Sequence, residues 1–232
     1  MEWRLDKFLT QLSVGTRSQV KEMIKKGRVC INGIHASKPE QKVDPENDMI
    51  TLDSKVLSYS RYVYYMLNKP SGVITATMDK KKETVVDLIE DKRKDMFPVG
   101  RLDIDTEGLL LITNDGELCH RLLSPKHHVD KCYYVETDEA IPQYAKESFE
   151  KGIDLGDFTA MPAQLEILDT CKANITIQEG KFHQVKRMFE AVGVKVTYLK
   201  RLSMGSLKLD EALKPGMSRA LTQEELECLK QI

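Results

Sequence analysis

The chain has 232 residues, a formal net charge of −1, 41% hydrophobic residues and 31% charged residues. This composition is typical of a folded protein with a hydrophobic core and excludes a disordered or fibrous chain. Apolar runs are far shorter than the roughly 20 residues that a membrane-spanning helix needs, and the N-terminus shows no secretory signal pattern. Five cysteines without a CxxC pair indicate reduced thiols rather than a disulfide framework. We therefore expect a cytoplasmic protein with no membrane partner.

Two segments are strongly basic although the chain as a whole is nearly neutral. Residues 16–28 contain five basic residues and one acidic residue, and residues 181–201 contain six basic residues and one acidic residue. A single basic segment is usually a solvated surface. Two such patches on a near-neutral body modestly favour a nucleic-acid partner.

The first sixty residues predict a small module of two helices followed by a small sheet. A short amphipathic helix is expected over 4–12, and Thr16 with Gln19 forms a capping box for a second helix that ends at Gly27. Strands are expected around the Asn32-Gly33 turn and over 48–52. Four cations at spacings of four, four and three are predicted to share one face: Arg17, Lys21, Lys25 and Arg28.

The rest of the chain predicts strands that follow one another through tight turns, with few helices. The predicted strands cover 62–67, 73–78, 109–113, 131–137, 163–168, 173–178, 194–202 and 207–209. The predicted helices cover 84–89 and 182–192, and a last helix starts at Thr222 with Glu225 as its capping-box partner.

This order of elements predicts an α+β protein of two domains. Residues 54–61 are the best candidate for a linker. We expect a helix-helix-sheet module over 1–59 and, over 60–232, a second domain whose mixed, largely antiparallel sheet is flanked by helices.

Two clusters resemble metal sites without meeting their spacing. Residues 103–108 begin like a calcium loop, but Asn114 stands where that loop requires a bidentate Glu. A second cluster consists of Cys119, His120, His127, His128 and Cys132. It lacks the closely spaced ligand pairs of structural zinc sites. The sequence also lacks a phosphate-binding loop, a dinucleotide fingerprint and a nucleophile elbow. We therefore predict neither a metal nor a cofactor.

One acidic residue is a candidate for a catalytic group. Asp103 follows Arg101 on a loop between Gly100 and Gly108 that leads into an apolar strand. A carboxylate in such a place suits a nucleophile or a general base, although the pattern alone favours a surface turn with a local ion pair. Lys186 and Arg187 stand near the start of a predicted helix, where a cation opposes the helix dipole and implies an anionic partner.

Three motifs in order resemble one family, the bacterial ribosomal RNA pseudouridine synthases of the RsuA type. They are LNKPSGV at 67–73, GRLDIDTEGLLLITNDG at 100–116 and GKFHQVKRMFEAVG at 180–193. The module at 1–59 resembles the small RNA-binding domain first described in a small-subunit ribosomal protein, which these enzymes carry at their N-terminus. SPKHHVDKCYYV at 124–135 is most similar to the branch that modifies small-subunit 16S rRNA.

The resemblance implies an isomerase that needs no cofactor, and it assigns roles to residues of this chain. Asp103 is the catalytic carboxylate, and Tyr133, in the pattern Lys131-Cys132-Tyr133, stacks on the uracil. The basic partner of the aspartate falls on Lys186, with an ambiguity of one residue toward Arg187. Arg101 fills the space left by the extruded base or holds the RNA backbone.

The resemblance also implies ribosomal RNA as the partner of a monomeric enzyme. The cations Arg17, Lys21, Lys25 and Arg28 would hold RNA phosphates, and Arg187 is either a phosphate contact or a solvated cation. Three alternatives stay open. They are a large-subunit 23S rRNA substrate, a non-catalytic RNA-binding factor for ribosome assembly, and a hydrolase that uses Asp103 as its general base.

Overall fold

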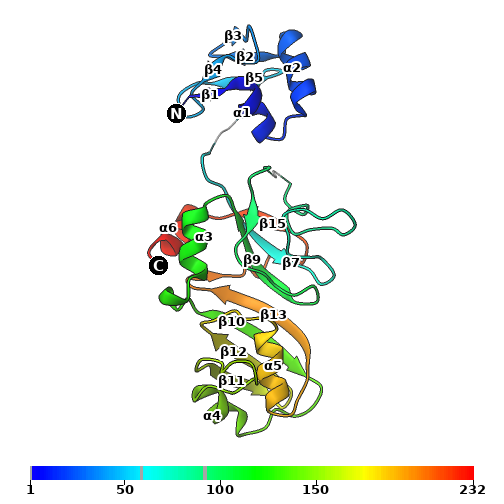
Figure 1. Cartoon of the computed structure of the whole chain (residues 1–232), viewed down its shortest axis with the longest axis vertical. Coiled ribbons are helices and arrows are strands. Elements are labelled where there is room, and N and C mark those ends of the chain that lie inside the picture. The colour runs from blue at the N-terminus through cyan, green and yellow to red at the C-terminus, as the bar shows by residue number, and fades with distance from the viewer. Residues whose placement is uncertain (1, 58–59, 91–92) are drawn as a thin grey trace. The chain divides into compact units, whose positions relative to one another are not determined.

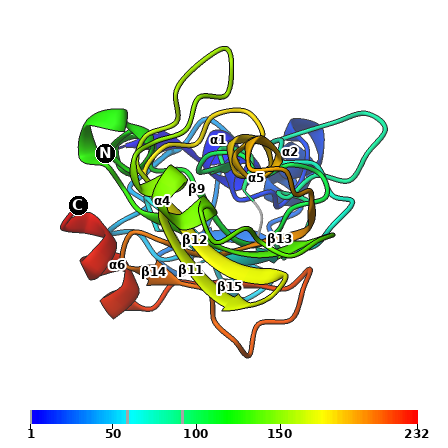
Figure 2. The ribbon, with the colours of Figure 1, turned by 90° about the horizontal axis from the view of Figure 1, so that it is seen from below.

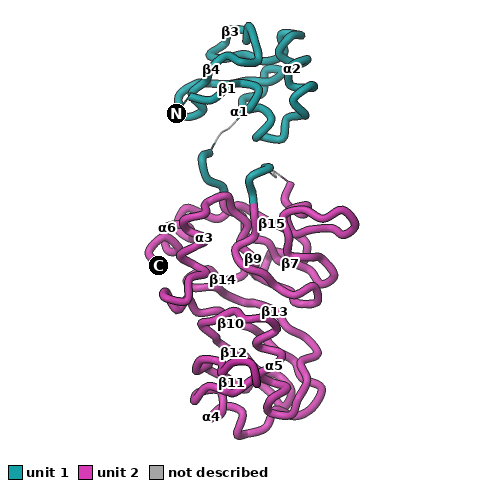
Figure 3. The backbone as a smooth tube through the Cα atoms, in the orientation of Figure 1, with its two compact units in different colours: residues 1–63, 91–96 teal, residues 64–90, 97–232 magenta. Residues whose placement is uncertain are grey.

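The computed structural model describes residues 2–57, 60–90 and 93–232 (Figure 1). Their contacts form two compact units, which Figure 3 colours separately. The small unit consists of Met1–Val63 and Asp91–Met96, and the large unit of Tyr64–Glu90 and Phe97–Ile232. The linker predicted over 54–61 includes residues 58 and 59, which lie outside the described residues. None of the helices in the described part of the chain has both the length and the apolar character that crossing a membrane requires.

The small unit has the predicted order of two helices and a small sheet. Its helices are α1 (Leu5–Gln11) and α2 (Arg17–Lys25). The predicted capping box is confirmed, because the Gln19 amide donates to Thr16 Oγ1 and the Thr16 amide donates to Gln19 Oε1. The strands are β1 (Trp3–Arg4), β2 (Val29–Ile31), β3 (Ile34–His35), β4 (Lys42–Val43), β5 (Ile50–Leu52) and β6 (Lys55–Val56). The sheet order β3-β2-β5-β6 contains the predicted hairpin, and β1 pairs separately with β4.

The core of the small unit decides which face of α2 meets solvent. Val20 and Ile24 are buried against apolar side chains of α1 and the sheet, so Arg17, Lys21 and Lys25 lie on the exposed side of the helix. The prediction that all four cations share one helix face is wrong for Arg28. It stands beyond the helix, and its Nε donates to Asp53 Oδ1 at 2.8 Å.

The large unit is built on one mixed sheet with the strand order β11-β12-β10-β13-β9-β7-β15. Its strands are β7 (Tyr64–Lys69), β8 (Phe97–Pro98), β9 (Glu107–Thr113), β10 (Lys131–Thr137), β11 (Gln164–Asp169), β12 (Lys172–Ile177), β13 (Val196–Met204), β14 (Leu207–Lys208) and β15 (Ser218–Ala220). Neighbours pair antiparallel except β9 and β13, which are parallel. The predicted mixed, largely antiparallel sheet is confirmed.

Helices pack against this sheet in two groups. They are α3 (Gly116–Leu123), α4 (Ala145–Glu150), α5 (Gln184–Ala191) and α6 (Gln223–Lys230). Leu118 of α3 and Leu229 of α6 share a buried cluster with Leu109 and Leu111 of β9. Helices α4 and α5 meet through Phe149 and Phe189 (ring centroids 5.3 Å apart), and Figure 2 shows both helices on one side of β11 and β12. The sequence predicted α5 and α6 but not α3 and α4.

The strand predicted over 73–78 is wrong. Ile74 makes only an isolated bridge to Thr84. Thr75 bonds to the main chain of Leu102 instead of to a strand: its hydroxyl donates to the Leu102 carbonyl at 2.7 Å and accepts from the Leu102 amide at 3.2 Å. The segment therefore serves as a support for the loop that carries Asp103.

The helix predicted over 84–89 is also wrong. Main-chain bonds span three residues, from Asp87 to Thr84 and from Ile89 to Val86, so the segment forms turns. A segment of six residues is too short to be a stable helix by itself, so its conformation depends on tertiary contacts such as the bond from the Val85 amide to the Ile74 carbonyl.

Gly108 allows the parallel strands β9 and β13 to approach each other. Its φ is +97°, and a Cβ atom there would lie 2.3 Å from the main-chain oxygen of Arg201 on β13. Any other residue would collide with that strand. This close approach brings the loop before β9 next to β13 and, through the sheet, next to β10.

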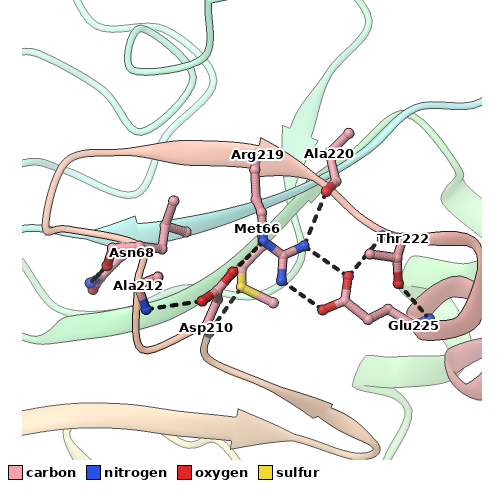
Figure 4. Close-up of polar contacts among 9 residues, drawn as sticks. Met66, Asn68, Asp210, Ala212, Arg219, Ala220, Thr222 and Glu225 are labelled. Carbon is pink, nitrogen blue, oxygen red and sulfur yellow. Dashed lines mark hydrogen bonds and ion pairs between the residues drawn. The ribbon is translucent and has the colours of Figure 1, made fainter.

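A polar network ties the last strand to the last helix (Figure 4). Arg219 of β15 donates through Nε to Asp210 at 2.7 Å and through Nη2 to Glu225 of α6 at 2.8 Å. Glu225 also closes the predicted capping box with Thr222, which is confirmed. Hydrogen bonds from Arg219 lower the pKa of Glu225 to about 2.

Candidate active site

A hollow in the large unit gathers the four residues that the sequence predicted to be catalytic. It lies where the loop before β9 faces β10 and the turn that leads into α5. Four predicted site residues line it: Arg101, Asp103, Tyr133 and Lys186. Leu102, Val185 and Leu199 add apolar wall. Segments more than 80 positions apart in the sequence are thus brought to one place.

A buried lysine holds the loop that carries Asp103. The Lys69 side chain, at the end of β7, is fully buried. Its ammonium donates to the carbonyls of Pro70, Ile104 and Thr106 at 3.0, 3.2 and 2.9 Å. Burial lowers the pKa of Lys69 to about 8. Together with Thr75, this lysine anchors both sides of Asp103, which fixes the carboxylate before any substrate binds.

The Asp103 carboxylate faces a lysine and a histidine of the α5 region. Lys186 Nζ lies 3.2 Å from Asp103 Oδ2 and donates to Asp105 Oδ1 at 2.6 Å. Burial lowers the pKa of Lys186, but the hydrogen bonds and charges of Asp105 and Asp103 outweigh burial and hold the pKa above its usual value. His183 Nε2 lies 3.5 Å from Asp103 Oδ1. The ammonium therefore stays charged and holds the carboxylate in place.

Tyr133 provides an aromatic wall opposite the carboxylate. It lies on β10, between Ile175 of β12 and Arg201 of β13, and is only 7% exposed. A bulge between Cys132 and Tyr133 interrupts the register with β13 at this point. Such irregularities re-aim side chains next to functional sites. Tyr133 thus adds an aromatic ring to the residues that line the hollow.

The other two predicted cations fall in different environments. Arg101 is exposed at the hollow, beside Asp103. Arg187 points elsewhere, because its guanidinium pairs with Asp157 and donates to the Leu155 carbonyl at 2.7 Å. It also lies over the Phe158 ring, 5.0 Å from the centroid. The structure therefore pairs the aspartate with Lys186 rather than Arg187.

The small unit carries a second basic surface. Arg17 and Lys21 of α2 line a hollow together with Arg4 and Lys7. Arg4 is held by Asp6, through Nε to Oδ1 at 3.0 Å and Nη2 to Oδ2 at 2.8 Å. This hollow has the exposed cations that RNA phosphates require.

Sequence reasoning missed several of these residues. Lys69 and His183 stand inside the motifs at 67–73 and 180–193, but nothing in their spacing showed that they approach Asp103. Arg4 and Lys7 are three residues apart at the start of α1, a spacing that could have predicted a shared face.

The cysteine and histidine cluster does not assemble. Across the described ranges, no three His, Cys, Asp or Glu side chains group in a way that could hold a metal ion. His128 adopts a left-handed conformation after a short 3₁₀ turn, Pro125–His127, while Cys119 belongs to α3. The cluster is thus divided among separate elements.

A fixed carboxylate and an aromatic wall in a hollow with basic residues, on a chain that carries a basic small unit, define an enzyme that acts on a nucleic-acid base. Comparisons with known proteins agree. Residues 63–191 match the family described as RNA pseudouridylate synthase, and residues 3–50 match the S4 domain. The chain belongs to the RNA pseudouridine synthase family.

Relatives match over almost the whole chain. An uncharacterized RNA pseudouridine synthase of Bacillus subtilis, YtzG, is 47% identical over 98% of each chain. The ribosomal small subunit pseudouridine synthase A of Escherichia coli is 38% identical over 96% of this chain and 98% of its own. A crystal structure of a pseudouridylate synthase is 38% identical, with a TM-score of 0.69 over 97% of this chain and 99% of that chain. The protein is therefore an isomerase that acts on RNA.

Proposed function

We propose that this enzyme converts one uridine of small-subunit 16S rRNA to pseudouridine, with Asp103 as the catalytic carboxylate. One observation carries the assignment of the residue: Asp103 lies in a hollow with Tyr133 and is held by Lys186 at 3.2 Å. The choice of 16S rRNA rests on relatives named for the small ribosomal subunit, at 38–40% identity.

The reaction breaks the bond between N1 of uracil and C1′ of the ribose and forms a bond between C5 and C1′. The proton leaves C5 and another is gained at N1, so no cofactor or water is consumed. Asp103 stabilises the separated sugar or base by covalent attack or by its charge. Lys186 orients that carboxylate through their ion pair.

The remaining residues of the hollow bind the base. Tyr133 stacks on the uracil, and its hydroxyl moves the C5 proton late in the reaction. The target base must leave its stack, at a cost of roughly a few kcal/mol. Arg101 occupies the vacated space or holds the backbone.

RNA contacts far from the base offset the cost of extrusion. Arg17, Lys21 and Lys25 of α2 bind phosphates, and Arg4 and Lys7 extend the same surface. Arg28 contributes less than these, because its guanidinium already pairs with Asp53. We propose a monomeric enzyme that acts in the cytoplasm, where ribosomal RNA is found.

The decisive experiment maps pseudouridines in ribosomal RNA from cells with and without the protein, by carbodiimide treatment and primer extension. We expect one signal of 16S rRNA to disappear. A missing signal in 23S rRNA would move the substrate to the large subunit. An unchanged map, with RNA still bound, would make the protein a non-catalytic assembly factor.

The same assay in vitro tests the carboxylate. Asp103→Asn should lower turnover at least about 1,000-fold, because it removes the charged group that acts in the transition state. RNA affinity should stay within a few-fold. Asp157→Asn, an exposed carboxylate that pairs with Arg187, is the matched control and should keep wild-type activity. Activity in the Asp103 variant would assign the role to another carboxylate.

A further inference from the structure

The turn before α5 exposes an aromatic ring beside the hollow. The sequence pattern predicted a helix from 182, but α5 begins at Gln184, so Phe182 and His183 stand outside it. Phe182 is 76% exposed, whereas Tyr133 in the same region is 7% exposed. Exposing a phenylalanine forfeits the stabilisation that burial of its ring would give, and folding alone does not explain it.

The exposed ring is linked to the catalytic carboxylate by a second ring. Phe182 and His183 stack with their centroids 3.8 Å apart and an interplanar angle of 19°. On its other side, His183 reaches Asp103, with 3.5 Å between Nε2 and Oδ1. One ring, that of His183, thus separates Phe182 from the Asp103 carboxylate, and the Phe182 side chain remains largely exposed.

The turn that presents the ring is held rigidly. Gln184, only 3% exposed, accepts from the Lys181 amide at 3.1 Å and donates to Glu179 at 3.0 Å. Glu179 in turn accepts from the Met161 amide at 2.8 Å. His183 has a φ of +52°, a left-handed conformation that is strained in a residue other than glycine. The ring is therefore fixed before a partner arrives.

The charges around the ring select the kind of partner. Lys181 and Arg101 line the hollow beside it, and Lys181 also pairs with Glu179 at 3.5 Å. An aromatic face among cations is what single-stranded nucleic acid binds, since bases stack on the ring and cations contact the backbone.

We propose that Phe182 is a stacking platform for the nucleobase next to the target uridine. This inference rests on the proposed function. When the target base enters the hollow at Asp103, a neighbouring base stacks on the free face of Phe182. His183, stacked beneath, couples the two positions and is a positioning residue for the carboxylate. The platform contributes to RNA affinity and to the choice of the extruded nucleotide, not to the chemical step.

Activity measurements separate this role from a structural one. With a 16S rRNA transcript as substrate, Phe182→Ala and Phe182→Leu should raise KM about 5- to 100-fold, the range expected when one base no longer stacks on an aromatic ring. The turnover number should change only a few-fold. Phe182→Trp should restore the wild-type KM, because it keeps a π-face. Leu168→Ala, an exposed apolar residue of β11, should behave like the wild type.

A binding experiment gives a readout that does not depend on turnover. The probe is a short single-stranded RNA in which a uridine has 2-aminopurine on its 5′ or 3′ side. Stacking should quench the fluorescence of one of the two probes on binding to the wild type and to Phe182→Trp, but not to Phe182→Leu. Thermal melts of each variant check that the fold is intact.

The outcomes distinguish the two proposals. Equal quenching by Phe182→Leu and the wild type, or an unchanged KM in Phe182→Ala, would overturn the platform. Quenching without any pseudouridine formation by the wild type would support the platform as an RNA-binding site and refute the proposed function.

Discussion

The hollow of the large unit and the basic face of α2 use charge in opposite ways. In the hollow, the side chains of Asp103 and Lys186 are 27% and 24% exposed and lie 3.2 Å apart. On α2, Arg17, Lys21 and Lys25 are exposed to solvent. Coulomb interactions are strong where water is partly excluded and weak where it is not.

This difference separates chemistry from binding. A charge that is fixed and partly buried cannot be replaced without leaving its partner unpaired. Solvated charges act together, because each cation that meets a phosphate adds a similar, salt-sensitive increment to the affinity. The hollow should therefore respond sharply to single substitutions, whereas α2 should respond gradually to several.

After Asp103, the largest effect is expected at Lys186. Lys186→Met leaves Asp103 and Asp105 without their cation, so turnover should fall at least about 100-fold, as the removal of one partner of a buried pair implies. Arg187→Met is the matched control. It stands next in the chain but pairs with Asp157, so turnover should remain within a few-fold of the wild type.

Two results would contradict the role of the Lys186–Asp103 ion pair. Normal turnover of Lys186→Met would show that the ion pair is dispensable. A decrease confined to Arg187→Met would transfer the role to that residue. In both variants, RNA binding should depend on salt concentration as it does in the wild type. Lys186 acts within the hollow, and Arg187 pairs with Asp157.

A smaller effect is expected on α2. Changing Arg17, Lys21 and Lys25 together to Gln should weaken RNA binding about 10- to 100-fold at moderate salt. The slope of log affinity against log salt should decrease by about 0.7–0.9 for each phosphate that is no longer neutralised. Turnover at saturating RNA should not change. Lys55→Gln, an exposed cation of β6, controls for a general decrease in positive charge. An unchanged slope in the triple variant would show that α2 does not touch the RNA backbone.

The smallest effect concerns an ion pair away from the hollow. Hydrogen bonds from Arg219 lower the pKa of Glu225 to about 2, below its ordinary value of 4.5. A carboxylate with a lowered pKa stabilises the folded state above pH 4.5, and this contribution is lost as the pH falls toward 2. Relative to Glu225→Gln, the wild type should lose roughly 1–3 kcal/mol of unfolding free energy across that window.

Urea unfolding at several pH values measures this decrease. Glu224→Gln, a neighbouring carboxylate on α6, should follow the wild type. At neutral pH, Glu225→Gln should have the turnover of the wild type. This result would show that an ion pair such as Arg219–Glu225 does not by itself make a catalytic site. Parallel acid curves for the wild type and Glu225→Gln would contradict the role of this ion pair.

Local signals in the sequence were reliable where neighbouring residues decide the structure. The capping boxes at Thr16 and Thr222 and the turn at Asn32-Gly33 are confirmed, because their hydrogen bonds join residues a few positions apart. The predictions over 73–78 and 84–89 are wrong because Thr75 and Val85 bond to residues that are distant in the sequence, Leu102 and Ile74, and the local pattern does not show such contacts.

The sequence by itself determined the α+β class, the chain order of the main elements and, through its motifs, the family to which the chain belongs. Only the tertiary structure decided that Lys186, not Arg187, faces Asp103, and that Lys69 and His183 reach the same loop. Periodicity places a residue on a face of its own element. Which distant element meets that face depends on strand order and on close approaches such as the one at Gly108.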